Sequence, residues 1–517
     1  MSAYPESMRY FLDEVNGASF NVFKLEPQNS NSAVANRILR FTLPANSLLN
    51  LRSFSLWFNM SAEAEGSDPG AGAQQVGGRL PAGIDRVVQR IEVTCGGVQL
   101  SAGSNFYNVL QQAKRSLEGE DMDSQLGHPY CVRVISPVDN NGVAVGTYPT
   151  NATCYNISTL ANSNEKYPAA NNATQFCISK WDGFLGECAP SILDSSLVPD
   201  IVVSIFLDDD SILASIRGTY LDQTGEAVAW AAGHQQCTDV AANRATWHMK
   251  NIHATIECIG LSDGVLDALE ASTIAQEGSL RVPFKQYFSF QDTTANTMRF
   301  NVATGSLDRI WIAHRVNNYN ALAGLARIEG SKYANAGAEG AAAVDDTGIN
   351  LPDQGVIQPL IKNVLAAGIN SYDSGGVMHI ENSGCEEYVT LKFLLQEPPN
   401  AAIPGAQRYQ LSLNASYYPQ FQATYEEMLG ISRNSVEKWR DDRISLFTQR
   451  SDFSTQCARF CLPNTGVRKI SGFDTRSVSL NGYYNMYNVD AARTVNLFCE
   501  CTSVLRIGEA RQLEVVQ

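Results

Sequence analysis

The stretch Leu49-Asn-Leu-Arg-Ser-Phe-Ser-Leu-Trp-Phe-Asn-Met60 decides the fold class of this chain. From residue 53 onward its side chains alternate between two faces. One face carries Phe54, Leu56, Phe58 and Met60, and the other carries Ser53, Ser55 and Trp57. A period of two is the period of a β-strand that lies with one face on a hydrophobic core. The stretch therefore predicts a long strand rather than a helix.

The residues around this strand predict a mostly β domain in the first half of the chain. Strand-like runs occur at 20–25, 37–43, 87–94, 98–100 and 201–207, and a long strand at Thr246–Ile259 closes the half. Gly96-Gly97 is typical of a hairpin turn. One helix is expected near Asn105–Leu117, with Ser104 as its cap. Its apolar residues share one stripe, namely Phe106, Val109, Leu110, Ala113 and Leu117.

The second half of the chain repeats this organisation. Strands are expected at 280–290, 298–303, 307–314, 389–395 and 411–415, and Arg493–Val504 is the long closing strand. Its lone helix is predicted at Tyr425–Leu429, where Thr424 and Glu427 form a capping box and Gly430 ends it. A further helix is predicted at Ser435–Phe447. The tail, Leu505–Gln517, is expected to pair along a sheet edge.

The whole pattern predicts an all-β protein built from two tandem jelly-roll β-sandwiches, with a few short helices and long loops. A chain of 517 residues is too long for one core, and two domains of roughly 200–250 residues suit this class. We expect a first jelly roll at 1–261, a linker helix at 262–277 and a second jelly roll at 278–517. The long loops are expected at about 118–190 and 320–355. Strands and helices do not alternate regularly, which argues against a parallel α/β sheet.

Composition and charge exclude several classes of protein. The chain has 38 basic and 53 acidic residues and a net charge of −15, so it has no general attraction for a phosphate backbone. We therefore expect no specific nucleic-acid binding. No apolar run of about 18 residues occurs, so no membrane span is expected. The polar start, Met1–Asn16, lacks the apolar region of a signal peptide.

One short motif is compatible with an enzyme. Gly260-Leu-Ser-Asp-Gly264 matches G-x-S-x-G and would make Ser262 an acyl-transfer nucleophile, with His314 or His379 as its base. That motif works on a parallel sheet covered by helices, which the chain lacks. A helix-capping serine between turn glycines explains the same residues. The sequence therefore favours a protein with no catalytic site.

Two further polar clusters have a simpler structural explanation. Asp373-Ser-Gly-Gly376 resembles the nucleophile loop of chymotrypsin-like proteases, but its distance from His314 is too short for a two-barrel protease, so a polar turn is favoured. Asp208-Asp-Asp210 is interpreted as a solvated acidic turn rather than a cation site.

The cysteines leave one question open. Cys457, Cys461, Cys499 and Cys501 could be free thiols, disulfides or a zinc site. Their C-x₃-C and C-x-C spacings depart from the common zinc signatures, and Cys499 and Cys501 share a strand face with Val495 and Leu497. Buried thiols are therefore the preferred interpretation, and we expect no metal and no cofactor.

In the order of its segments and in their residue patterns, the chain resembles a known family, the double jelly-roll major capsid proteins of the adenovirus and tectivirus lineage. The likeness is strongest to those of polinton-like viruses and virophages. It rests on the strand 49–59, on Ile84-Asp-Arg-Val-Val-Gln-Arg-Ile-Glu-Val93 with Gly96-Gly-Val-Gln-Leu100, on Asn105-Phe-Tyr-Asn-Val-Leu110, and on the ending 503–516. The number of cysteines in the chain departs from what this family resemblance would lead us to expect.

The resemblance implies a structural virion protein without catalytic activity. It would be the major capsid protein, which self-assembles as pseudo-hexagonal homotrimers into an icosahedral shell that encloses DNA. Its partners would be further copies of itself, with penton and minor capsid proteins. It would reside in the capsid of a virion assembled in the host cytoplasm or nucleus. Two alternatives stay open at this point, a glycan-binding or spike-type β-sandwich protein and a serine hydrolase that uses Ser262.

Overall fold

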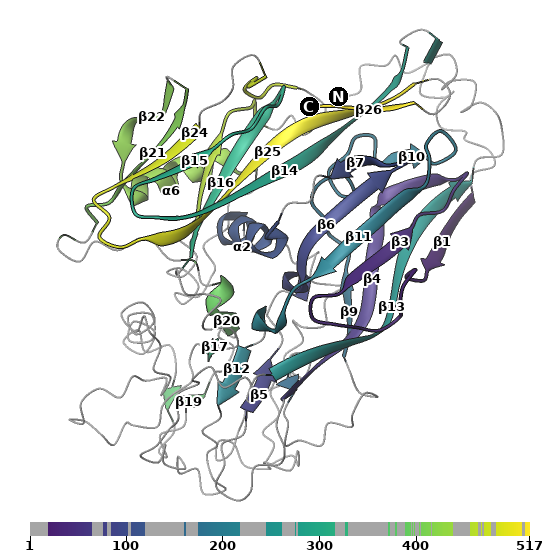
Figure 1. Ribbon diagram of the computed structural model, residues 1–517, viewed down its shortest axis with the longest axis horizontal. Coiled ribbons are helices and arrows are strands. Elements are labelled where there is room, and N and C mark those ends of the chain that lie inside the picture. Colours follow the sequence, from purple (N-terminus) through teal and green to yellow (C-terminus); the bar gives the residue numbers. More distant parts are fainter. Residues whose placement is uncertain are drawn as a thin grey trace, which may run out of the picture.

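The computed structural model describes a defined part of the chain (Figure 1). The described residues are 19–64, 76–79, 84–101, 105–118, 160–161, 174–212, 214–217, 245–260, 274–275, 278–315, 326–328, 371–372, 378–379, 388–393, 405–414, 416–437, 455–463, 470–476, 482–508 and 512–517, with single residues between them. Most of the predicted linker helix at 262–277 and most of the long loops at 118–190 and 320–355 lie outside these residues; 274–275, within the linker, are helical.

Two antiparallel sheets form a sandwich from the first half of the chain. One sheet has the order β1 (Ser19–Leu25), β13 (Ala245–Gly260), β4 (Leu48–Ala64) and β10 (Ile192–Asp194), with β2 (Ala33–Val34) and β9 (Thr174–Ile178) paired to it. The other has the order β3 (Ile38–Thr42), β11 (Ile201–Leu207), β6 (Val88–Cys95) and β7 (Val98–Ser101). In both sheets the central strands turn their apolar residues inward, as the alternation in β4 predicted.

The second half of the chain forms a sandwich of the same design. One sheet has the order β14 (Leu280–Thr294), β25 (Arg493–Ile507), β16 (Leu307–Arg315) and β23 (Thr455–Arg459), and β26 (Leu513–Val516) pairs with β25. The other has the order β15 (Thr297–Phe300), β24 (Gly482–Tyr487), β21 (Arg408–Leu413) and β22 (Ser416–Ala423). The expected pairing of the tail along a sheet edge is confirmed by β26.

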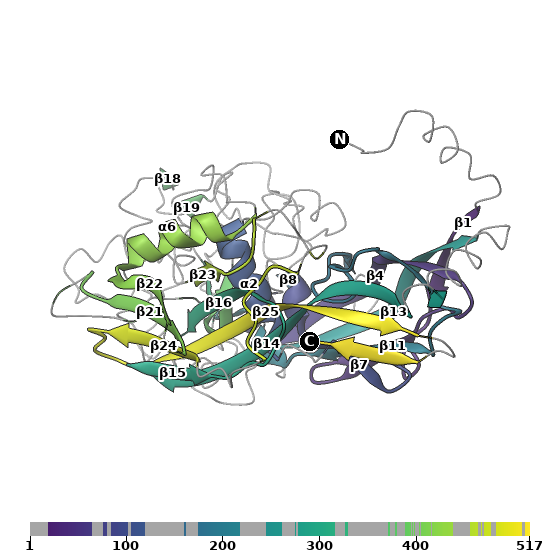
Figure 2. The ribbon, with the colours of Figure 1, turned by 90° about the horizontal axis from the view of Figure 1, so that it is seen from above.

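The strand order identifies both sandwiches as jelly rolls. When the strands off the main path of each sheet and the small two- and three-stranded sheets are left aside, eight strands remain in each half. Counted from the N-terminus, they lie in the orders 1-8-3-6 and 2-7-4-5. Two four-stranded antiparallel sheets connected in this way make a jelly roll. The predicted fold class is therefore confirmed. Figures 1 and 2 show the two jelly rolls side by side, joined by the long strands β14 and β25.

The remaining elements are short. They are β5 (Val76–Arg79), β8 (Leu160–Ala161), β12 (Ala214–Arg217), β17 (Ala326–Ile328), β18 (Ser371–Tyr372), β19 (Met378–His379) and β20 (Tyr388–Thr390), with the 3-10 turns η1 (Ile84–Val87), η3 (Asp210–Ile212) and η6 (Leu391–Phe393). No helix among the described residues is long and apolar enough to cross a membrane.

Each jelly roll has an α-helix after its fifth strand. α2 (Tyr107–Glu118) follows β7, as predicted. α6 (Tyr425–Ser435) follows β22 and begins with the predicted capping box of Thr424 and Glu427. The prediction that Gly430 ends this helix is wrong. The helix continues because its next turn packs on β23, where the backbone N–H of Cys457 donates to the Ser432 hydroxyl at 2.8 Å.

Two other local predictions are also wrong. Ser435 is the last residue of α6 rather than the first of another helix, since Val436 has the extended conformation; residues 438–447 lie outside the described part. The strand predicted at 389–395 stops at Thr390 and becomes the turn η6. That turn allows two consecutive side chains, Lys392 and Phe393, to reach the first jelly roll, where each is buried.

Candidate functional site at the junction of the two jelly rolls

The predicted catalytic residues do not form a site. Ser262 and 373–376 lie outside the described residues, and His379 is placed only as part of β19. His314 is fully buried in the second jelly roll, where its Nε2 lies 3.0 Å from the Tyr484 hydroxyl. A histidine enclosed in this way has no open face for a substrate.

The four cysteines considered as zinc ligands do not lie together in the structure. Cys499 and Cys501 belong to the core between the two sheets of the second jelly roll. Cys457 lies on the opposite face of the same sheet, beside Trp311 and Phe498. Cys461 is half-buried beyond the end of β23, and all four are free thiols in this structure. Because the sheet separates them, they cannot together bind one metal ion.

The acidic run 208–210 is not a solvated turn, contrary to the prediction. Asp208 is fully buried, and its carboxylate accepts a 2.7 Å hydrogen bond from the Lys392 ammonium. Asp209 accepts a second hydrogen bond from the same ammonium at 3.1 Å. Lys392 belongs to η6, so this ion pair joins the end of β11 to the second half of the chain. A buried charge is tolerated only with such a partner.

α2 makes a contact between the two jelly rolls. The predicted apolar stripe, with Val109, Leu110, Ala113 and Leu117 buried, packs on the outward face of the β14–β25–β16–β23 sheet. The residues that it meets include Tyr287, Trp311, Cys457 and Phe498. As a result every residue of β16 is buried, because one face of this strand meets the core and the other meets α2. The stripe was predicted, but its partner was not.

Backbone pairing adds to this contact. The segment that follows β9 runs along β14, where the Ala189 N–H donates to the Pro283 carbonyl at 3.0 Å and the Lys285 N–H donates to the Glu187 carbonyl at 3.2 Å. The segment itself is anchored in the first jelly roll, because the Trp181 indole donates to the Phe54 carbonyl at 3.0 Å. The junction is thus part of both cores rather than a flexible hinge.

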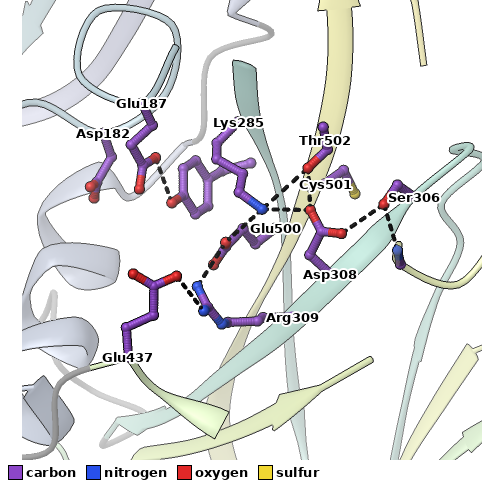
Figure 3. Close-up of polar contacts among 12 residues, drawn as sticks. Asp182, Glu187, Lys285, Ser306, Asp308, Arg309, Glu437, Glu500, Cys501 and Thr502 are labelled. Carbon is purple, nitrogen blue, oxygen red and sulfur yellow. Dashed lines mark hydrogen bonds and ion pairs between the residues drawn. The ribbon is translucent and has the colours of Figure 1, made fainter. Parts of the chain in front are cut away.

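A network of buried charges lies beside α2 (Figure 3). Lys285 is paired with Asp308 at 2.6 Å and with Glu500 at 3.3 Å. Glu500 is also paired with Arg309 at 3.1 Å and accepts a hydrogen bond from the Trp311 indole at 3.0 Å. All of these side chains come from neighbouring strands of the second jelly roll, and none exposes more than 8% of its surface.

The first jelly roll supplies the other half of the network. Lys114 of α2 is paired with Asp182 at 2.8 Å and lies 3.6 Å from Glu187. The Tyr287 hydroxyl of β14 donates to Glu187 at 2.8 Å. Lys114 and Glu187 therefore contact the same tyrosine from across the junction, and the charged groups of the two jelly rolls meet around it.

The network shifts the pKa values of its carboxyls in opposite directions. Burial would raise the pKa of Glu500, but Arg309 and Lys285 outweigh it and hold that pKa well below its usual range. Burial raises the pKa of Glu187, which Lys114 offsets only in part. Burial also raises the pKa of Glu118, at the end of α2, to about 7. Of these carboxyls, Glu118 is therefore the one whose pKa lies close to neutral pH.

Sequence reasoning missed this network because the ion pairs join residues that lie far apart along the chain, such as Lys285 with Glu500. One signal was present. The run 307–315, Leu-Asp-Arg-Ile-Trp-Ile-Ala-His-Arg, lacks the alternation seen in β4. A strand without alternation is buried on both faces, so its charged residues must be paired inside the protein.

The structure is similar to solved capsid proteins along nearly its whole length. PBCV-1 VP54, from a crystal structure fitted into a cryo-EM reconstruction of the virophage Sputnik, aligns with a TM-score of 0.50 and 10% identity over 97% of this chain and 97% of that chain. The Faustovirus major capsid protein aligns with a TM-score of 0.49 and 11% identity over 95% of this chain and 91% of that chain. The mavirus major capsid protein aligns with a TM-score of 0.41 and 8% identity over 96% and 89%.

No protein-family model and no curated protein sequence matches this chain. The likeness to VP54 is one of fold, because identity is low while the alignment covers almost all of both chains. The chain therefore has the double jelly-roll major capsid protein fold.

Proposed function

We propose that this protein is a structural virion protein, the major capsid protein of an icosahedral DNA virus. The observation that carries the proposal is the repeated strand order, 1-8-3-6 and 2-7-4-5, in two jelly rolls along one chain. VP54 has the same double jelly-roll fold, aligned over 97% of both chains, which supports the proposal. We infer that the copies assemble as homotrimers with a pseudo-hexagonal outline, since three chains with two jelly rolls each present six similar units.

The proposal includes how the chain is divided. We place the first jelly roll at 1–261, a linker at 262–277 and the second jelly roll at 278–517. The pairing of all the strands of each sandwich within one half supports this division. The rigid junction made by α2 supports a role in a shell, because a capsomer built from two fixed units keeps its outline when it packs among neighbours.

In this role the protein carries out no catalysis. The enclosure of His314 and the separation of the four cysteines by a sheet both support that interpretation. The net charge of −15 suits a shell that surrounds DNA without binding it tightly. Its partners would be neighbouring capsomers, penton proteins and minor capsid proteins of the virion.

The mass of the purified native protein in solution tests the proposal. We expect light scattering to give about three times the 56.3 kDa chain mass, and negative-stain images of the same sample to show hexagonal particles. A stable monomer that never forms trimers, sheets or shells would contradict the proposal. It would favour a glycan-binding or spike-type sandwich protein instead. Hydrolysis of an ester that is lost in Ser262→Ala would favour the hydrolase.

A further inference from the structure

Lys285, Asp308 and Glu500 form a buried trio on three neighbouring strands (Figure 3). β25 carries Glu500 and lies between β14, which carries Lys285, and β16, which carries Asp308. The Lys285 ammonium donates to Oδ2 of Asp308 at 2.6 Å and lies 3.3 Å from Oε1 of Glu500. Lys285 is 7% exposed, and the two acidic residues are each 1% exposed. An amine, a carboxyl group and a second carboxylate are therefore held together away from water.

A β-bulge aims Asp308 at this lysine. Leu307 pairs with Cys501 and Arg309 pairs with Glu500, so Asp308 is the extra residue of β16 at this point. A bulge interrupts the regular alternation of side chains and redirects one of them. Leu307 stays in the core between the two sheets, whereas the Asp308 carboxyl reaches the ammonium on β14. The backbone of β16 is thus shaped to bring this carboxyl to the amine.

Each carboxylate oxygen of Asp308 also accepts a hydrogen bond from a hydroxyl group. Oδ1 accepts from Ser306 at 2.7 Å, and Oδ2 accepts from Thr502. The Ser306 oxygen itself accepts from the backbone N–H of Gly472 at 2.9 Å, so its own proton stays directed at Asp308. Fixed donors of this kind stabilise the negative charge that a carboxyl oxygen gains when a nucleophile adds to the carboxyl carbon. The surroundings of Asp308 therefore suit attack on its Cγ atom by the neighbouring amine.

We propose that Lys285 and Asp308 form an isopeptide bond across β25, with the Thr502 hydroxyl as a proton relay. The ammonium first passes one proton to Oδ2 of Asp308 across their hydrogen bond. The amine then adds through its lone pair to Cγ of Asp308, and negative charge collects on Oδ1, where Ser306 donates.

The second half of the reaction expels water. The nitrogen is positively charged after the addition, and the Glu500 carboxylate beside it stabilises that charge. Oγ1 of Thr502 lies 3.2 Å from Nζ of Lys285, so this hydroxyl takes up a proton from the nitrogen and passes its own to Oδ2. The Cγ–Oδ2 bond breaks, its electron pair leaves with the oxygen as water, and the carbonyl re-forms at Oδ1. One ammonium and one carboxylate have become one amide and one water molecule, and no group is oxidised or reduced.

The ion pair is the starting state, and it makes the reaction slow. Burial lowers the pKa of Lys285, but Glu500 and Asp308 outweigh burial and keep that pKa above its usual value. The amine is therefore rarely free to attack. The bond needs to form only once in the life of a chain, however, and the folded protein holds the two groups in contact throughout. The chain modifies itself in this way without turning over a substrate.

Two other buried lysines contact two carboxylates each, but water reaches those carboxylates. Lys392 is paired with Asp209 as well as Asp208, and the side chain of Asp209 is 45% exposed. Lys114 is paired with Asp182 and lies near Glu187, whose side chain is 29% exposed. Of these three lysines only Lys285 has both acidic neighbours enclosed. Lys392 and Lys114 should therefore remain in ion pairs, and they serve as internal controls.

The mass of the denatured wild-type chain tests the inference. We expect it to be lower than the mass calculated from the sequence by one water molecule, because an amide survives denaturation and an ion pair does not. Trypsin should leave Lys285 uncleaved and yield segment 282–299 joined to segment 300–309. Fragment ions that begin at both Val282 and Phe300 separate this product from the uncleaved linear segment of equal mass. Cleavage after Lys114 and Lys392 in the same digest is the control.

Thr502→Val tests the proton relay with little change in side-chain size. In protein collected at intervals after a pulse of expression, we expect the loss of water to slow by about 10²–10⁴-fold. Thr502→Ser keeps the hydroxyl group and should restore the rate. Thr494→Val is the matched control, because Thr494 is a buried threonine of the same strand whose hydroxyl lies 3.2 Å from that of Thr293; it should react as the wild type does. Circular dichroism shows whether each variant is folded.

The outcomes separate this inference from the proposed function. A folded wild-type chain that keeps its full calculated mass, or that trypsin cleaves after Lys285, would overturn the isopeptide bond and leave the capsid proposal intact. A folded Thr502→Val variant that reacts at the wild-type rate would overturn the relay. If that variant does not fold, the wild-type mass and its tryptic peptides still decide whether the bond exists.

Discussion

The ammonium nitrogen of Lys114 on α2 lies 3.0 Å from the hydroxyl oxygen of Tyr287 on β14 and 5.0 Å from the centroid of its ring. These two residues belong to different jelly rolls. The same ammonium is 2.8 Å from Asp182, and the same hydroxyl is 2.8 Å from Glu187. Lys114 is thus the cation that neutralises a buried carboxylate, Asp182, and a half-buried one, Glu187, where the first jelly roll meets the second.

Loss of this cation should destabilise the protein severely. In Lys114→Met the Asp182 carboxylate stays buried and the Glu187 carboxylate half-buried, but both lose their cationic partner. Removing one member of a buried ion pair costs about 3–5 kcal/mol, so we expect the free energy of unfolding to fall by that order. Chemical denaturation measures it. Arg506→Met is the control, since Arg506 and Glu514 form an exposed pair that contributes little. Equal effects of the two substitutions would contradict the prediction.

The junction should weaken as pH rises toward neutrality. The pKa of Glu118 is raised by burial to about 7 in the folded protein, from 4.5. The folded state then holds more protons than the unfolded state between these two values, so stability falls as pH increases through this window. In Glu118→Gln this dependence should be reduced, and the variant should exceed the wild type in stability at pH 8 by about 1–3 kcal/mol. Denaturation midpoints at pH 5 and pH 8 measure the difference. An unchanged slope would contradict the prediction.

The residues that could be predicted from sequence are those whose pattern is local. The alternation in β4, the stripe of α2 and the capping box at Thr424 each depend on neighbours within a few residues, and all three appear in the structure. The end of α6 could not be predicted in this way. Gly430 is a local signal for a helix end, but packing on β23 outweighs the preference of one residue.

The charged network shows what lies beyond local patterns. Lys285 and Glu500 are far apart along the chain, and they meet because β14 pairs with β25. The sequence predicts a solvated turn at Asp208 because nothing near this residue along the chain indicates Lys392 as its partner. Whether an isolated charge is solvated or buried depends on a partner that only the sheet order brings near.

The cysteines of the second jelly roll should differ in reactivity. Burial raises the pKa of Cys457 and of Cys499 well above the ordinary value, and both are fully buried. Cys461 is half-buried. Alkylation of the native protein should therefore label Cys461 well before Cys457, Cys499 or Cys501. Peptide mass spectrometry after timed labelling measures the order. A zinc chelator should leave the thermal midpoint unchanged; a fall, or protection of Cys461 together with Cys457, would favour a metal site.

The two glycines in the hairpin between β6 and β7 should differ in how much stability is lost when each is replaced by alanine. Gly96 and Gly97 both have a positive φ, of 54° and 86°, so alanine is strained at either position, by about 1–2 kcal/mol. A Cβ atom at Gly96 would also lie 2.6 Å from Cγ of Pro199, whereas one at Gly97 would meet nothing within 4 Å. Gly96→Ala should therefore lower the unfolding midpoint more than Gly97→Ala, which serves as the matched control. Thermal denaturation measures both, and equal losses would show that Pro199 moves aside without cost.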